Sequence, residues 1–160
     1  MPCCQSVRIN PYKSVLQKFS KTIEIVKNFD LMTDYEEAIH FILDYVEENE
    51  HILNCVFDSM GRDQLKRFFF SDFIVIARKL VLSVEAEMNC KLDENFRDFL
   101  CHFYTEAIAG MLTEWIQDNI KYSRQTALEY ISIIFFESIP NIIKRRCDMH
   151  IMIDHDHKDI

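Results

Sequence analysis

Residues 103–131 read FYTEAIAGMLTEWIQDNIKYSRQTALEYI, and this stretch decides the fold. Apolar side chains recur at helical spacing from Phe103 until the polar residues Asp118 and Asn119 interrupt the pattern. The pattern restarts at Ser123 and continues through a second apolar segment. The stretch therefore predicts two long apolar helices that are joined by a short polar connection.

Further helix signals lie on the N-terminal side of this stretch. Pro11 is suited to the first position of a helix, and the residues Thr33 to Glu36 fit a capping box. Gly61 is a normal residue for a helix end, and Asp93 is a capping residue for the next helix. We expect helices at about 11–28, 35–48, 50–60, 62–87, 94–119 and 124–146.

Composition supports an all-helical protein of one domain. The chain has 160 residues, of which 49% are apolar and 13 are Phe, so it can fill a sizeable core. Only 2 Gly and 3 Pro are present, which disfavours a fold rich in tight hairpins. We expect an all-α, single-domain bundle of about six helices. Its parts are a disordered N-terminus at 1–10, a helical domain at 11–146 and a polar His- and Asp-rich tail at 147–160.

The residues of the opening stretch resemble the dimer-forming end of the regulatory domain of TetR-type transcription regulators. Those that carry the resemblance are Phe103, the pairs Ala109-Gly110, Trp115-Ile116 and Asp118-Asn119, and Ser123. The resemblance covers about Tyr12 to Ile143. It implies a domain that senses a small, often apolar effector and forms dimers. Members of the family begin with a helix-turn-helix DNA reader, whereas ten residues precede Pro11 here, so we expect a regulatory domain without its own reader.

The last predicted helix favours self-association. Residues 131–136 read ISIIFF, so this helix is apolar nearly all round, and a peripheral helix of that kind needs a covering surface. The resemblance implies that the last two helices of two copies pair in a four-helix arrangement. We expect a homodimer, with Met111, Trp115, Ile133 and Phe136 as its contacts.

The surplus of aromatic residues is consistent with an apolar ligand cavity between helices. We place this cavity between the predicted helices 50–60, 62–87 and the first half of 94–119. The alternative is that the rings pack into a dry core. The candidate ligand-binding residues are Phe57, Met60, Phe69, Phe73, Phe99 and Phe103.

Charge and cysteine usage limit the partners and the location. A formal net charge of -8 is the wrong sign for a nucleic-acid binder, so we expect no direct DNA binding by this chain alone. The six cysteines are scattered and include no CxxC pair, which indicates reduced thiols. No segment reaches about 18 consecutive apolar residues, and the N-terminus lacks the pattern of an export signal. We expect a cytoplasmic protein without a membrane segment.

Enzymatic motifs are weak. Two glycines, Gly61 and Gly110, cannot build a phosphate-binding loop, so nucleotide enzymes with such loops are excluded. The pairs Glu37/His40 and Glu48/His51 have the spacing of di-iron ligands, but they occur in one acidic stretch and the first pair lies on a polar helix face. The cluster Lys144-Arg145-Arg146 fits the end of a helix. We expect no enzyme activity, no cofactor and no metal site.

Two alternatives remain open at this stage. The chain could be an interaction protein that heterodimerises with a full-length regulator and removes it from DNA. It could also be a small helical metal-dependent enzyme, which the metal content of untagged protein would test.

Overall fold

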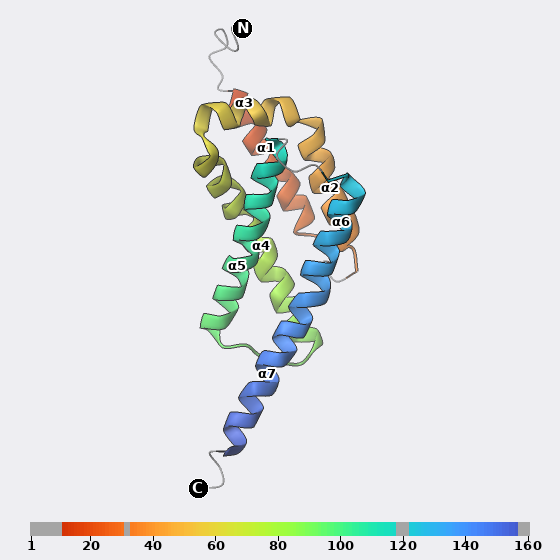
Figure 1. Ribbon diagram of the computed structural model, residues 1–160, viewed down its shortest axis with the longest axis vertical. Coiled ribbons are helices and arrows are strands. Elements are labelled where there is room, and N and C mark those ends of the chain that lie inside the picture. Colours follow the sequence, from red (N-terminus) through yellow and green to blue (C-terminus); the bar gives the residue numbers. More distant parts are fainter. Residues whose placement is uncertain (1–10, 31–32, 118–121, 157–160) are drawn as a thin grey trace.

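The computed structural model describes residues 11–30, 33–117 and 122–156, and these residues form an elongated helical bundle (Figure 1). The segments α6, η1 and α7 follow one another without a break, so the described residues make six helical rods and contain no strand. The predicted all-α class is confirmed. The helices are α1 (Pro11–Val26), α2 (Tyr35–Glu48), α3 (Glu50–Met60), α4 (Arg62–Glu87), α5 (Glu94–Ile116), α6 (Arg124–Ser132), the π-helical η1 (Ile133–Glu137) and α7 (Ser138–Asp156).

The predicted helix boundaries have clear chemical causes. The amide of Phe96 donates to Asp93 Oδ1 at 2.9 Å, and the amide of Thr126 donates to Ser123 Oγ at 3.2 Å, so both residues cap their helices. Gly61 ends α3 with a φ of 80°, a left-handed conformation that costs glycine little. These three short polar or small residues set where α4, α5 and α6 begin.

One predicted cap and one predicted boundary differ from the structure. α2 starts at Tyr35 as expected, but its N-cap is Asp34 rather than Thr33, and Asp34 makes no side-chain cap hydrogen bond. The last helix runs past Arg146 to Asp156, so the basic cluster 144–146 lies inside a helix and its reading as a helix end was wrong. The predicted disordered segment 1–10 lies outside the described residues.

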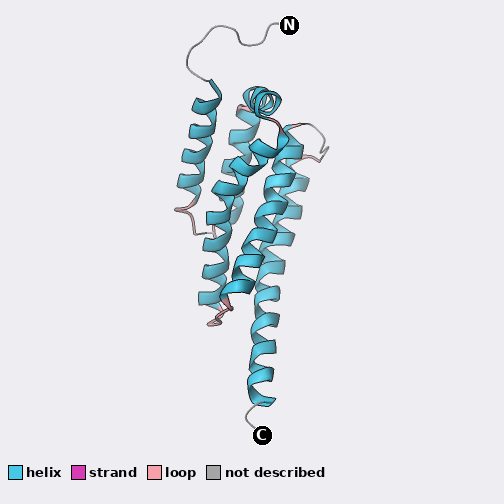
Figure 2. Cartoon of the chain, turned by 90° about the vertical axis from the view of Figure 1, so that its left-hand side faces the viewer, coloured by secondary structure: helices cyan, strands magenta, loops and turns pink. Residues whose placement is uncertain are grey.

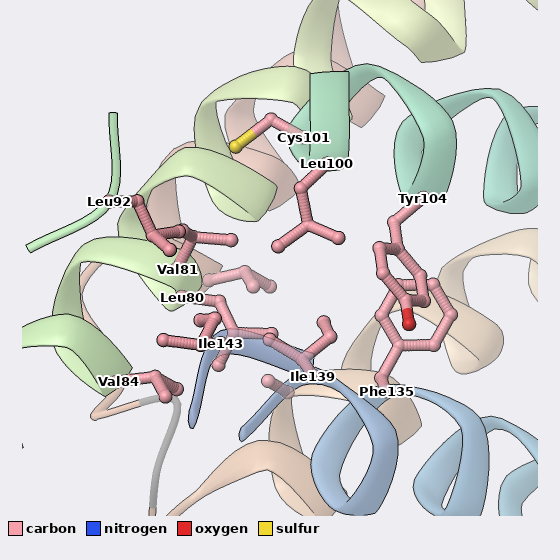
Figure 3. Close-up of a cluster of buried hydrophobic side chains, with 12 residues drawn as sticks. Leu80, Val81, Val84, Leu92, Leu100, Cys101, Tyr104, Phe135, Ile139 and Ile143 are labelled. Carbon is pink, nitrogen blue, oxygen red and sulfur yellow. The ribbon is translucent and has the colours of Figure 1, made fainter. Parts of the chain in front are cut away.

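Two groups of buried side chains fill the bundle. We call the group that includes residues of α3 the upper cluster and the group that includes residues of α7 the lower cluster, because α3 lies at the top of Figure 1 and α7 at its lower end. The upper cluster contains residues of all five helices from α1 to α5. It consists of Phe19, Ile23, Val46, Leu53, Val56, Leu65, Phe69, Phe73, Ala109, Leu112 and Ile116. The lower cluster brings in η1 and α7 and consists of Val26, Ala38, Leu80, Val81, Val84, Leu92, Leu100, Cys101, Tyr104, Phe135, Ile139 and Ile143 (Figure 3).

A buried ion pair closes the connection between α4 and α5. Both oxygens of Glu85 accept hydrogen bonds from Arg97, at 2.7 and 2.8 Å, and Oε1 also accepts the amide of Leu92 at 2.7 Å. Arg97 in turn donates to the carbonyl of Leu92 at 3.1 Å. This arrangement holds the loop between the two helices that pack most extensively on each other.

A second arginine joins the last helix to α2. Arg124 forms ion pairs with Asp44 and with Glu47, the latter at 3.0 Å, and it donates to the carbonyl of His40 at 3.1 Å. Because Arg124 is the first residue of α6, these contacts fix the start of the last helix against the side of the bundle.

The lower end of the bundle carries a disulfide between Cys90 and Cys147, whose Cα atoms are 6.3 Å apart. The expectation of reduced thiols is corrected for this pair, because α7 returns past the α4–α5 loop and brings the two residues together. Next to the disulfide, Arg146 lies 3.1 Å from Asp93 and stacks over Phe96 at 5.1 Å from the ring centre. Beyond these contacts α7 extends past the lower ends of the other helices (Figure 2).

The last helix is unusually apolar for its position. Within the described residues, Arg124–Met149 is long and apolar enough to cross a membrane, with a hydropathy of 1.2 and 28% of its apolar window buried. A single such helix is weak support for a membrane span, since helices of soluble cores pass the same test.

Candidate functional site: an apolar cavity at the centre of the bundle

The side chains of the upper and lower clusters leave a cavity of about 80 Å³ unfilled between them. Ile42 of α2, Ile76 of α4 and Ile108 of α5 pack against both clusters and form part of its wall. The remaining lining residues are Val26, Ala38, Ile39, Phe73, Ala77, Leu80, Tyr104, Thr105, Ile131, Phe135 and Phe136. Six elements, α1, α2, α4, α5, α6 and η1, thus enclose one apolar space.

A second cavity of about 60 Å³ adjoins the first on the side of α2 and α5. It shares five lining residues with the first cavity, among them Ile108 and Ile131, and it adds Met111, Leu112 and Trp115. The side chains of the shared residues therefore form the wall between the two spaces. Together they provide room for a compact apolar molecule.

Two polar side chains belong to the wall of the first cavity. Tyr104 lies beside Phe135, with ring centres 4.9 Å apart, and its hydroxyl is 2.8 Å from Ser138 Oγ (Figure 3). Thr105 is buried, and its hydroxyl has no hydrogen-bond partner. Among the residues that the structure describes, no Asp, Glu, Lys, Arg or His lines this cavity, so the site fits an uncharged ligand.

Of the six predicted ligand-binding residues, Phe73 is the one that lines the central cavity. Phe57, Met60 and Phe69 belong to the upper cluster or pack against it, and the ring of Phe69 is fully buried. The ring of Phe19 from α1 lies between 5.0 and 6.0 Å from those of Phe68, Phe69 and Phe73. Aromatic packing therefore occupies the space where the sequence placed the cavity, and the cavity lies lower, between α2, α4, α5 and η1.

Phe99 and Phe103 lie on the outer face of α5, where 65% and 60% of their surfaces are exposed. The two rings stack on each other at 6.3 Å, and Phe103 also contacts Tyr104 edge-on at 5.6 Å. The structure therefore places both residues outside the cavity. Whether either contacts a ligand stays a prediction.

The predicted dimer residues occupy two kinds of position. Ile133 is half-exposed on η1, beside the equally exposed Ile134. Phe136, Met111 and Trp115 are partly buried and line the two cavities. Met111 and Trp115 thus share a cavity-lining position on α5 with Ile108. The dimer contacts themselves stay predictions.

The candidate metal and nucleophilic residues are accounted for by other contacts or by exposure. Glu37 and Glu48 are exposed, and Arg124 Nη2 lies 3.0 Å from His40 Nδ1. Across the described ranges, no group of three or more His, Cys, Asp or Glu residues could hold a metal ion. Cys101 is fully buried, and burial raises the pKa of its thiol, which suits a core residue rather than a nucleophile.

The described residues form an all-helical bundle with a central apolar cavity and an apolar last helix. The family model described as the C-terminal region of transcriptional regulators, of the TetR type, matches residues 33–137. The chain belongs to this family, which confirms the resemblance seen in the sequence. No curated protein and no solved structure matches the chain significantly.

Proposed function

We propose that this domain is the sensor of a TetR-like regulator, that it binds a small uncharged effector in the central cavity, and that it works as a homodimer. The observation that carries the proposal is the cavity itself, whose wall has residues of α2, α4 and α5 on one side and of α6 and η1 on the other. A regulator of this family acts by binding rather than by catalysis. The proposal therefore includes no enzyme activity and a cytoplasmic location.

The composition of the wall supports a link between effector and dimer. Phe135 and Phe136 line the cavity, and the preceding Ile133 and Ile134 are half-exposed on the outside of the same π-helical segment. A ligand that pushes on the inner residues must also shift the outer ones, because they share one turn of backbone. Effector binding would then change the geometry of whatever covers Ile133 and Ile134.

A second copy of the chain is the covering surface that we favour. The exposed large apolar residues of α5 and of the last helix are Phe99, Phe103, Tyr130, Ile133, Ile134 and Met149. The packed rings of Tyr104 and Phe135 connect α5 to η1. These are the helices through which the family pairs. The revised interface thus includes Phe99 and Phe103 in place of their predicted role as ligand contacts.

A cavity-filling variant tests the effector site. Ala77 lines the cavity, so Ala77→Leu adds three carbon atoms to the empty space. We expect thermal shift to show an unchanged or higher melting temperature and calorimetry to show loss of binding for small apolar molecules that bind the wild type. The matched control is Ala86→Leu at an exposed position of the same helix, which should bind normally. Undiminished binding by Ala77→Leu would place the effector elsewhere.

A further inference from the structure

Thr105 is the unusual polar residue of the cavity. It has 1% of its surface exposed, it lines the cavity, and its hydroxyl makes no hydrogen bond. Two other buried threonines behave differently. Thr113 donates to the carbonyl of Ala109 at 2.7 Å, and Thr22 donates to the carbonyl of Lys18 at 3.1 Å. Each thus uses the carbonyl four residues earlier, which is the usual way to satisfy a threonine hydroxyl in a helix.

An unpaired buried hydroxyl is unfavourable for an isolated domain. Removal of a hydroxyl from water without a new hydrogen bond costs free energy, and native proteins rarely leave such groups unsatisfied. A valine has the same shape and would avoid this cost. The hydroxyl of Thr105 therefore indicates a partner that enters the cavity from outside.

The other polar groups near the cavity are already engaged. The hydroxyl of Tyr104 is 2.8 Å from Ser138 Oγ, and Ser138 Oγ donates to the carbonyl of Ile134. This chain of hydrogen bonds ends on the backbone of η1, so it leaves Thr105 as the hydroxyl of the cavity wall that is free to bind a ligand.

The π-helical segment adds an independent sign of function at the same place. A π turn interrupts a helix at a cost in regular hydrogen bonding, and such turns are frequent at functional sites. Here η1 contributes the consecutive residues Phe135 and Phe136 to the wall of the same cavity. The irregular backbone and the unpaired hydroxyl of Thr105 thus lie on the boundary of one space.

We propose that Thr105 is the polar anchor of the effector site, and that the effector is a compact, uncharged, largely apolar molecule with one hydrogen-bonding oxygen, such as a phenol, an alcohol or a ketone. This inference rests on the proposed effector function of the same cavity. The absence of charged residues from the wall disfavours a carboxylate or an amine. The two adjoining cavities have volumes of about 80 and 60 Å³, and their combined volume is close to the cavity of about 150 Å³ that holds benzene in an engineered protein.

Phenol and toluene form a matched pair of probes, because they differ by a hydroxyl in place of a methyl group. We would measure both dissociation constants by NMR titration of the full chain, for the wild type, Thr105→Val and the control Thr113→Val. The dissociation constant of phenol divided by that of toluene should rise about tenfold in Thr105→Val, because phenol loses one hydrogen bond and toluene does not. It should stay unchanged in Thr113→Val.

The outcomes separate the anchor from the site. If both probes bind and Thr105→Val leaves the ratio unchanged, the anchor is refuted while the effector cavity stands. If neither probe binds any variant, both the anchor and the proposed function of the cavity fail. The melting temperature gives a second criterion. Thr105→Val removes an unpaired hydroxyl and should not lower the melting temperature, whereas Thr113→Val removes a hydrogen bond and should lower it. An equal fall in both variants would show that Thr105 has a partner within the protein, which would also refute the proposal.

Discussion

At Glu85, burial and hydrogen bonding act in opposite directions. Burial favours the neutral carboxyl, but hydrogen bonds from Arg97 and from the amide of Leu92 favour the carboxylate, and their sum lowers the pKa of Glu85 below its ordinary 4.5. The carboxylate is therefore the form on which the α4–α5 connection depends. The side chain of Glu85 thus fixes the loop through which α4 is connected to α5.

Removal of the arginine partner should be costly. Arg97→Met leaves the Glu85 charge buried without its partner, and we expect a loss of about 3–5 kcal/mol in the free energy of unfolding. The control is Arg78→Met, which breaks the exposed pair with Asp98 and should cost less than about 1 kcal/mol. Urea denaturation measures both variants. Equal losses would mean that burial of the pair has no special importance.

Acid should weaken the same contact. Because the folded pKa of Glu85 is lowered, its contribution to stability is complete above about pH 4.5 and is lost as the pH falls through the folded value. The stability difference between the wild type and Glu85→Gln should therefore shrink between pH 6 and pH 3. A stability difference that stays constant between pH 6 and pH 3 would contradict the lowered pKa of Glu85.

Among the elements, α7 depends most on contacts made far from it in sequence. Its end is held to the α4–α5 loop by the disulfide of Cys90 and Cys147 and by the contacts of Arg146 with Asp93 and Phe96. In a reducing compartment such a disulfide opens, so the attachment of α7 would depend on redox conditions.

The disulfide should stabilise the oxidised chain. It closes a loop over a sequence separation of 57 residues, and Cys147→Ser should lower the free energy of unfolding by about 2–4 kcal/mol without reductant. Dithiothreitol should bring the wild type to the level of the variant and leave the variant unchanged. The control Cys55→Ser, at a cysteine that is not part of this disulfide, should keep the full response to reductant. A wild type insensitive to dithiothreitol would be inconsistent with the bond.

The sequence predicted the elements better than their contacts. Asp93, Ser123 and Gly61 act within a few residues of themselves, so their roles as helix boundaries could be read from local chemistry. The same rules placed the cap of α2 at Thr33, whereas its N-cap is the next residue, Asp34. Local signals thus predicted most helix starts without fixing each one.

The candidate site was predicted only in part, because it depends on how helix faces meet. Phe73 was expected at the cavity and lines it, whereas Phe99 and Phe103 lie on the outer face of α5. Helical periodicity shows which residues share one face of a helix, but it does not show which other helix packs against that face. The sequence could not identify Thr105, because its hydroxyl stands out only by the absence of a hydrogen-bond partner in the folded structure.

At the scale of the whole molecule, the exposed apolar face of α5 and η1 needs a cover. Ile134→Glu places a charge on that face, and we expect light scattering to show a dimer for the wild type and a monomer of 19.1 kDa for the variant. A stable interface of this kind buries about 2,000 Å² or more in total. The control is Val75→Glu on α4, where the side chain is equally exposed at 45% against 47%. Dissociation by both variants would indicate general unfolding, and dissociation by neither would exclude this face.

The charge of the molecule sets its behaviour towards DNA. With a formal net charge of -8, this chain by itself should not bind duplex DNA selectively at physiological salt, because phosphate contacts need basic side chains. Fluorescence anisotropy with labelled duplexes measures this. Sequence-selective binding by the purified chain would contradict the prediction.

Native mass spectrometry of the untagged chain tests sensing and pairing together. A homodimeric sensor predicts a species of twice 19.1 kDa that carries one small uncharged molecule per chain, either retained from expression or added as phenol. The Ala77→Leu variant should give the same dimer without the added mass. A 19.1 kDa monomer that takes up no ligand at any concentration of phenol would contradict the account at its centre.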